Sequence, residues 1–113
     1  MEKSYPAYRT GKNIQIKMAQ QMGIIECNFN HLLRTFGRPN YNRDNGDEFD
    51  GLEWCAWHIQ FESGELVRIT DSRQFGNMEN DYTKCNQWKV NTRSEKAYEW
   101  IKQAIRDSNP NGR

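Results

Sequence analysis

Residues 55–70 read CAWHIQFESGELVRIT, and this stretch decides the predicted fold. Apolar and more polar side chains alternate over residues 55–62, as they do in a strand that is buried on one face only. Ser63 and Gly64 predict a short turn, and residues 66–70 predict the returning strand. The stretch therefore predicts an antiparallel hairpin.

The chain that follows the hairpin predicts a third strand and a helix. Residues 72–86 form a polar loop, and residues 87–91 predict a short strand with Trp88 facing inward. Ser94 is a typical helix N-cap, and apolar residues then recur at helical spacing. The apolar face of that helix consists of Ala97, Ile101, Ala104 and Ile105. Residues 107–113 are expected to be a frayed tail.

The chain before the hairpin predicts two helices joined by a glycine turn. Residues 1–11 are polar and are expected to form an arm. Apolar residues at helical spacing predict a first helix over residues 12–22, which Gly23 ends. A second apolar stripe predicts a helix over residues 25–36, which stops at Gly37. The predicted N-terminal unit is therefore a helical hairpin.

Together these elements predict a single α+β domain over residues 1–113. Its parts are an N-terminal helical hairpin, a three-stranded antiparallel meander and a C-terminal amphipathic helix, with the helices covering one face of the sheet. Leu, Ile, Val and Phe make up only 19 of the 113 residues. We therefore expect a thin core in which the four tryptophans supply much of the buried apolar surface. A core this small favours a homo-oligomer, a dimer or higher, that buries a further face.

The composition argues against several classes of protein. Sixteen basic and fifteen acidic residues give a net charge of +1, whereas general nucleic-acid binders carry a clear basic excess. No apolar run reaches the ~18 residues of a membrane span, and the N-terminus lacks the apolar segment of a secretory signal. We therefore expect no membrane partner and a cytoplasmic location.

No pattern in the sequence predicts catalysis or metal binding. The three cysteines, Cys27, Cys55 and Cys85, are far apart and odd in number, which predicts free thiols. The Asn- and Asp-rich loop over residues 38–51 satisfies no register of an EF-hand. Cys27 lies four residues before His31, but nothing supplies an oxyanion donor, and no glycine-rich phosphate loop is present. We expect a protein that is not an enzyme and that holds neither a metal nor a cofactor.

Residues 15–34 match the spacing of a helix-turn-helix unit, which leaves a DNA-binding regulator as an alternative. The recognition helix would cover residues 26–36 and would present polar side chains to base edges. Those side chains are Asn28, Asn30, His31 and Arg34. Glu26 opposes this reading, because phosphates would repel it.

Arginines near loops and strand ends predict a site for a small anion. Guanidinium groups bind phosphate in a bidentate manner, and the helix that starts after Ser94 adds backbone N–H groups. An aromatic side chain such as Phe75, Tyr82 or Trp88 would stack on a base. The candidate ligand-binding residues are Arg38, Arg68, Arg73, Phe75, Asn91 and Arg93.

Residues 36–105 resemble a pattern found in small phage-encoded proteins. The matching segments are FGRP at 36–39, DG at 50–51, WHIQFESG at 57–64, ITD at 69–71 and WKV at 88–90. The chain departs from the pattern at Arg38, where an acidic residue is common, and at Asn91 and Thr92, where a glycine pair often follows the strand. Most of these positions are turn glycines and core aromatics, so they specify the fold better than the function.

Within this group, the chain is similar to the Thoeris anti-defence sponges, which sequester cyclic ADP-ribose-type signals without cleaving them. Those proteins assemble from dimers and line pockets at subunit contacts with arginines and an aromatic side chain that stacks on adenine. The resemblance implies a phage counter-defence protein that binds a small anionic nucleotide in the cytoplasm of the infected bacterial host. The alternative that it leaves is a protein that inhibits a host defence effector by direct contact, as anti-CRISPR proteins do.

Overall fold

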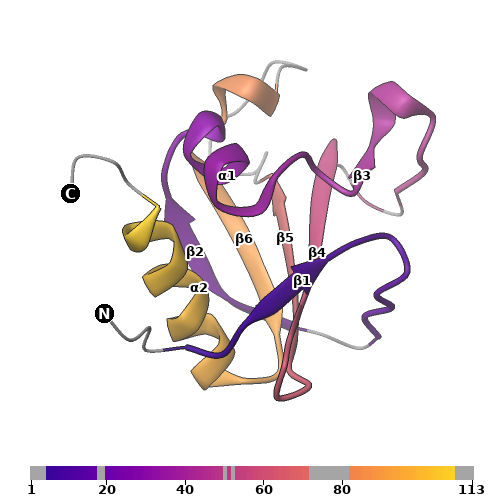
Figure 1. Cartoon of the computed structure of the whole chain (residues 1–113). Coiled ribbons are helices and arrows are strands. Elements are labelled where there is room, and N and C mark those ends of the chain that lie inside the picture. Colours follow the sequence, from indigo (N-terminus) through magenta and orange to yellow (C-terminus); the bar gives the residue numbers. More distant parts are fainter. Residues whose placement is uncertain (1–4, 18–19, 50, 52, 72–81, 109–113) are drawn as a thin grey trace.

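The computed structural model describes residues 5–17, 20–49, 51, 53–71 and 82–108. These residues form β-strands, two α-helices and two short 3-10 helices, labelled η (Figure 1). In chain order the elements are β1 (Tyr8–Thr10), β2 (Gln20–Glu26), α1 (Phe29–Phe36), β3 (Tyr41–Asn42), η1 (Arg43–Asn45), β4 (Cys55–Phe61), β5 (Leu66–Asp71), η3 (Tyr82–Lys84), β6 (Gln87–Thr92) and α2 (Glu95–Asp107).

The described strands form one antiparallel sheet in the order β1-β4-β5-β6-β2, and β3 pairs with β4 outside this path. The predicted hairpin is confirmed as β4 and β5, in which Trp57 lies opposite Ile69. The predicted third strand is β6, and its Val90 lies on the other side of Ile69. The prediction of a three-stranded sheet is nevertheless wrong, because β1, β2 and β3 extend these central strands to six.

The predicted first helix is absent, and so is the helical hairpin. Residues 11–17 are not helical, and Gln20–Glu26 is strand β2, which pairs with β6 from end to end except for a register shift at Met22. Gly23 does not end a helix. It lies in β2 beneath Tyr98 of α2, where an added Cβ would lie 2.6 Å from Tyr98 Cζ. The apolar residues that suggested a helix are divided between the segment over residues 11–17, which holds Ile14, and strand β2, which holds Met22. The helix-turn-helix interpretation therefore loses its basis.

The predicted second helix is present but shorter. It is α1, and it begins at Phe29 because the side chain of Asn28 caps it by accepting a hydrogen bond from the His31 backbone N–H (2.8 Å). Gly37 ends α1 with a positive φ of 81°, as the sequence predicts. The residues that precede Asn28 are extended because they complete β2.

Both ends of the chain hold more structure than the sequence predicts. The supposed polar arm contains β1, whose Tyr8 lies opposite Phe61 of β4. The predicted N-cap of α2 is confirmed, because Ser94 Oγ accepts from the Ala97 backbone N–H (3.1 Å). Helix α2 runs to Asp107, one residue into the predicted tail, and residues 109–113 lie outside the described part of the chain.

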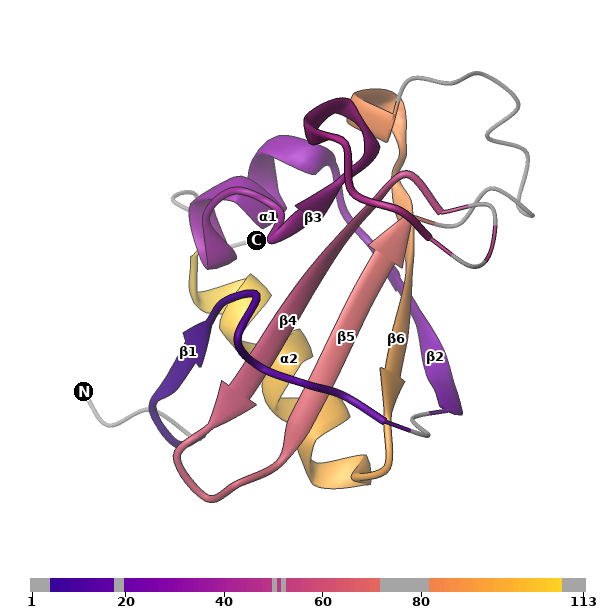
Figure 2. The same cartoon turned by 90° about the vertical axis from the view of Figure 1, so that its right-hand side faces the viewer.

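Both helices pack on one face of the sheet, which we call the helix face (Figures 1 and 2). Trp57 and Trp88 are fully buried there, with ring centroids 5.4 Å apart in an edge-on arrangement. Their indole N–H groups donate to the carbonyl oxygens of Gly37 and Cys27, each at 2.9 Å. The aromatic weight predicted for the core is therefore confirmed.

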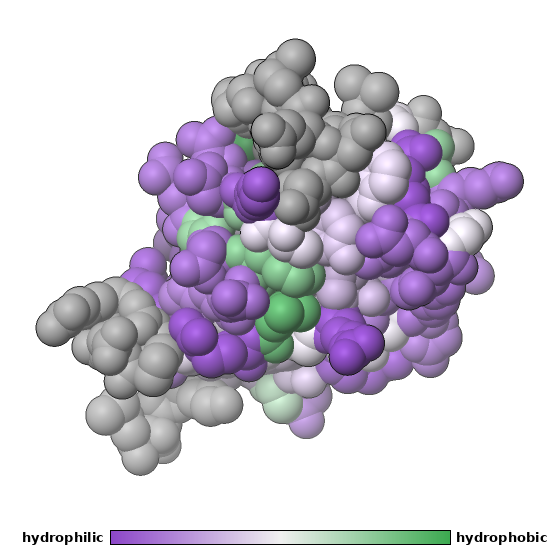
Figure 3. Space-filling model, turned by 90° about the horizontal axis from the view of Figure 1, so that it is seen from above, coloured by the Kyte–Doolittle hydropathy of each residue, from purple (hydrophilic) through white to green (hydrophobic). Residues whose placement is uncertain are grey.

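The opposite face of the sheet, the polar face, is crossed by the segment that joins β1 to β2. Residues 11–17, which we call the strap, run across β4 and β5 on the side away from α2 (Figure 2). Ile14 anchors the strap, because its side chain is only 2% exposed and its carbonyl oxygen binds His58. The end seen from above shows mostly hydrophilic residues around a small hydrophobic patch (Figure 3).

Candidate functional site

The side chains of the polar face come from the alternate positions of the central strands. Trp57 and Ile69 point to the helices, so His58 of β4 and Arg68 of β5, which lie opposite each other, point to the polar face. Arg68 in turn lies opposite Asn91 of β6. The register therefore places a row of polar side chains across the middle of the sheet.

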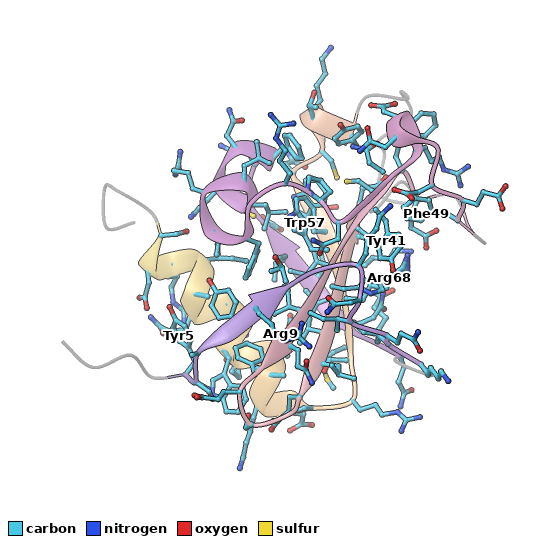
Figure 4. The ribbon with its side chains drawn as sticks, turned by 45° about the vertical axis from the view of Figure 1, so that its right-hand side comes forward. Tyr5, Arg9, Tyr41, Phe49, Trp57 and Arg68 are labelled. Carbon is cyan, nitrogen blue, oxygen red and sulfur yellow. The ribbon has the colours of Figure 1, made fainter. Side chains whose placement is uncertain are left out.

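Part of this row forms the floor of a pocket of about 280 Å³, which we call the Arg68 pocket. Its lining residues come from the strap, from β3, from the loop between η1 and β4, and from the two central strands. They are Ile16, Tyr41, Glu48, Phe49, Gly51, Glu53, His58 and Arg68. Figure 4 shows Tyr41, Phe49 and Arg68 together on one side of the sheet, well away from Tyr5.

Arg68 is held in place by His58 and Phe49. Its Nε lies 3.2 Å from His58 Nε2, and its Cζ lies 5.7 Å from the centre of the Phe49 ring. The Tyr41 ring packs against His58 with centroids 4.7 Å apart. The pocket thus combines a guanidinium group with two aromatic walls, and guanidinium groups favour such faces.

His58 is neutral in this arrangement. Arginine Nε can only donate, so His58 Nε2 accepts, and Nδ1 carries the proton that is donated to Ile14 O (2.8 Å). Burial lowers the pKa of His58, the hydrogen bond to Ile14 opposes this, and the charge of Arg68 lowers the pKa further. The net result is a pKa below the ordinary histidine value.

The loop that carries Phe49 is built around Arg43. The Arg43 side chain donates to the carbonyl oxygens of Glu53 and Gly51, each at 2.6 Å. Its Cζ lies 5.3 Å from the centre of the Phe49 ring and 5.6 Å from the Trp54 ring. Phe49 therefore contacts two guanidinium groups, those of Arg43 and Arg68, and its position in the pocket is fixed from both.

A second tie joins this loop to the strap. Asp47 accepts from the Asn42 backbone N–H (2.9 Å) and pairs with Lys12 of the strap (2.6 Å). The hydrogen bond from Lys12 is the main reason that the pKa of Asp47 lies below its usual value. Tyr41 also donates to the Lys12 carbonyl oxygen (3.0 Å). The strap and the Arg68 pocket are thus one connected structure.

Two carboxylates give the pocket an acidic side. Glu53 pairs with Lys89 of β6 at 3.2 Å. Burial raises the pKa of Glu53, but a backbone hydrogen bond and the charges of Lys89 and Arg68 outweigh it and hold the pKa below the usual value. Glu48 is exposed. The pocket therefore offers a cation for an anionic group and carboxylates for amino or hydroxyl groups.

The structure brings together only part of the predicted site. Arg68 lines the pocket and Asn91 is its cross-strand neighbour. Arg93 is exposed just after β6 and lines a separate pocket of about 270 Å³, which shares Ile16 with the Arg68 pocket. Arg38 is exposed in the turn between α1 and β3 and lines no pocket described here. The other two candidates, Arg73 and Phe75, lie outside the described residues.

Sequence reasoning missed Tyr41, Phe49 and His58 as site residues. An isolated aromatic in a strongly polar loop was the available signal for Phe49. His58 was interpreted as an exposed or hydrogen-bonded strand residue, but it is only 8% exposed. Tyr41 lies in the same polar loop over residues 38–51, but it reaches the pocket through the pairing of β3 with β4, which the sequence did not predict.

The other chemical candidates from the sequence do not form a second site. His31 Nε2 is bonded to the Ile105 carbonyl oxygen of α2 (2.6 Å). Burial, with a smaller effect of Cys85, raises the pKa of the Cys27 thiol to about 12, so this thiol is not a nucleophile at neutral pH. Among the described residues, no group of three acidic, histidine or cysteine side chains could hold a metal ion.

No family model matches the chain, and neither curated proteins nor solved structures give a match. Within the part of the chain that the structure describes, none of the helices has the length and apolar character needed to cross a membrane.

Proposed function

We propose that the protein binds a small nucleotide in the Arg68 pocket and sequesters it without cleaving it. We place this activity in the host cytoplasm, as part of the phage counter-defence role that the sequence resemblance implies. The observation that carries it is the position of Arg68, whose guanidinium group lies beside Phe49 and is held by His58.

The guanidinium group of Arg68 supplies the anion contact. Its Nε is used by His58, and neither terminal nitrogen makes a hydrogen bond to a described residue. The planar fork is thus available for two parallel hydrogen bonds to a phosphate. Such charge-assisted bonds contribute about 1.5–3 kcal/mol each.

Tyr41 and Phe49 supply surfaces on which a base can stack, and Glu53 and Glu48 supply acceptors for amino or hydroxyl groups. Stacking on one aromatic ring is worth about 1–3 kcal/mol. The volume of about 280 Å³ lies just below the ~300–1,000 Å³ of typical ligand pockets, so one copy of the chain offers room for about one nucleotide unit. The homo-oligomer that the composition predicts would add a second wall.

The pocket favours binding over turnover because its histidine is occupied. Both ring nitrogens of His58 are hydrogen-bonded, to Arg68 and to Ile14, so His58 offers no free general base. Glu53 is paired with Lys89. A ligand that is held here should therefore be released chemically intact when the protein is denatured.

The proposal is tested by calorimetric titration with ADP-ribose, cyclic ADP-ribose and AMP. Arg68→Gln should weaken binding at least tenfold, because it removes about 1.4 kcal/mol or more of anion contact. Arg38→Gln is the matched control and should change affinity by less than about twofold, since Arg38 is exposed outside the pocket. Equal loss in both variants, or no binding of any probe at millimolar concentration, would refute the proposal.

The fate of the ligand is read in the same samples. Heating the complex and separating the protein should return the nucleotide intact by mass spectrometry. A cleaved product would make the protein an enzyme instead. Native mass spectrometry of protein purified from a defence-active host should show a retained small molecule, whereas a bound host protein without nucleotide would favour the inhibitor alternative.

A further inference from the structure

We infer that His58 is the positioning residue of the Arg68 pocket and that it makes ligand binding sensitive to acid. The inference rests on the proposed function, since it concerns the same pocket. Unlike the proposed function, the inference needs only the contacts among His58, Arg68 and the strap, which exist without a ligand.

The two partners of His58 fix a single neutral form of its ring. A guanidinium group only donates and a carbonyl oxygen only accepts, so neither Arg68 nor Ile14 can exchange its role. The backbone of His58 is fixed as well: its N–H donates to Asn40 Oδ1 (2.8 Å), and its carbonyl oxygen accepts from the Gly11 N–H (3.2 Å). The ring is therefore a rigid acceptor aimed at Arg68 Nε.

Protonation of His58 would reverse this contact. The added proton sits on Nε2, so two N–H groups and two positive charges would face each other where one hydrogen bond existed. The bond from Nδ1 to Ile14 would persist, so the strap stays anchored and Arg68 is the group that moves. Arg68 would leave the floor of the pocket, and the phosphate contact would leave with it.

Among the residues that the structure describes, no other charged group bonds to His58 to compensate for this repulsion. From β5 it faces the cation of Arg68, and from β3 it faces the neutral ring of Tyr41. Lys12 of the strap lies over the Tyr41 ring, and its Nζ is 5.3 Å from the ring centroid. The carboxylate of Glu53 is paired with Lys89. The carboxylate of Glu48 lines the same pocket and is exposed, but neither Glu48 nor Glu53 makes a described hydrogen bond or ion pair with the ring. The cation of Arg68 is therefore the charged group that the protonated ring would contact directly.

The test compares the pH profiles of binding for ADP-ribose, whose diester phosphates do not titrate between about pH 5 and about pH 7.5. Wild-type affinity should fall progressively as the pH falls from about 7.5 to about 5 and His58 becomes protonated. His58→Gln, which can accept from Arg68 and donate to Ile14 but cannot be protonated, should bind with a flat profile. The matched control His31→Gln should keep the wild-type profile.

A ligand-free measurement separates failure of this inference from failure of the proposed function. Nitrogen NMR of the wild-type protein should show His58 as the Nδ1–H tautomer at about pH 7.5 and should show the Arg68 Nε–H signal shifting as His58 is protonated. If the Arg68 Nε–H signal does not shift when His58 is protonated, the inference is wrong. This result holds even if no nucleotide binds and even if His58→Gln does not fold. If ADP-ribose binds with the same profile in wild type and His58→Gln, the inference falls while the binding function stands.

Discussion

The two faces of the sheet are made by alternate residues of the same strands, yet their side chains are satisfied in different ways. On the helix face, the side chain of Trp57 is fully buried and makes one hydrogen bond, from its indole N–H to Gly37 O. On the polar face, its neighbour His58 is also buried, but both ring nitrogens and both backbone groups are bonded. The helix face thus stabilises the fold by burial, whereas the hydrogen bonds of the polar face hold Arg68 in position.

The first prediction tests whether the faces divide stability and binding in this way. Trp57→Ala should lower the free energy of unfolding by about 3–5 kcal/mol, because it leaves a large cavity beside Trp88. Arg68→Gln should lower it by no more than about 1 kcal/mol, because the pocket is open to solvent and one hydrogen bond is lost. Urea denaturation measures both, and similar losses in the two variants would contradict the division.

The central strands could be predicted from sequence because their signals are local. Alternation over residues 55–61, the turn at Gly64 and the capping serine Ser94 each act within a few residues of chain. The first predicted helix failed because β2 is defined by pairing with β6, more than sixty residues away. Met22, Gly23 and their neighbours have the spacing of a helix, and tertiary pairing overrides it.

The same distinction explains the site. Arg68 and Asn91 were predicted because they lie on strands that the sequence reveals. Tyr41 and Phe49 reach Arg68 through β3 pairing and through the hydrogen bonds of Arg43 to a loop that has no regular pattern. Those contacts join segments that composition cannot bring together, so the aromatic walls were not foreseen.

The second prediction tests the edge of the helix face, where β2 meets α2. Gly23→Ala should destabilise the protein by about 1–3 kcal/mol, because the new Cβ would overlap the Tyr98 ring. Tyr98 also donates to Ile24 O (3.3 Å), so its displacement removes that bond. In the double variant Gly23→Ala/Tyr98→Ala, the loss should be smaller than the two single losses together. Additive losses in urea denaturation would show that Tyr98 is not the obstacle.

The smallest expected effect is on the polar face, and it concerns stability against pH. The pKa of His58 is lowered in the folded protein, so the unfolded chain binds a proton at a higher pH than the folded chain does. The stability associated with neutral His58 is therefore complete above the unfolded value of about 6.5 and is lost as the pH falls through the folded pKa. Between about pH 7 and about pH 5, the wild-type protein should lose more unfolding free energy than His58→Gln does. Equal losses would mean that His58 is protonated as easily in the folded protein as in the unfolded one, and the polar face would then owe nothing to the neutrality of its histidine.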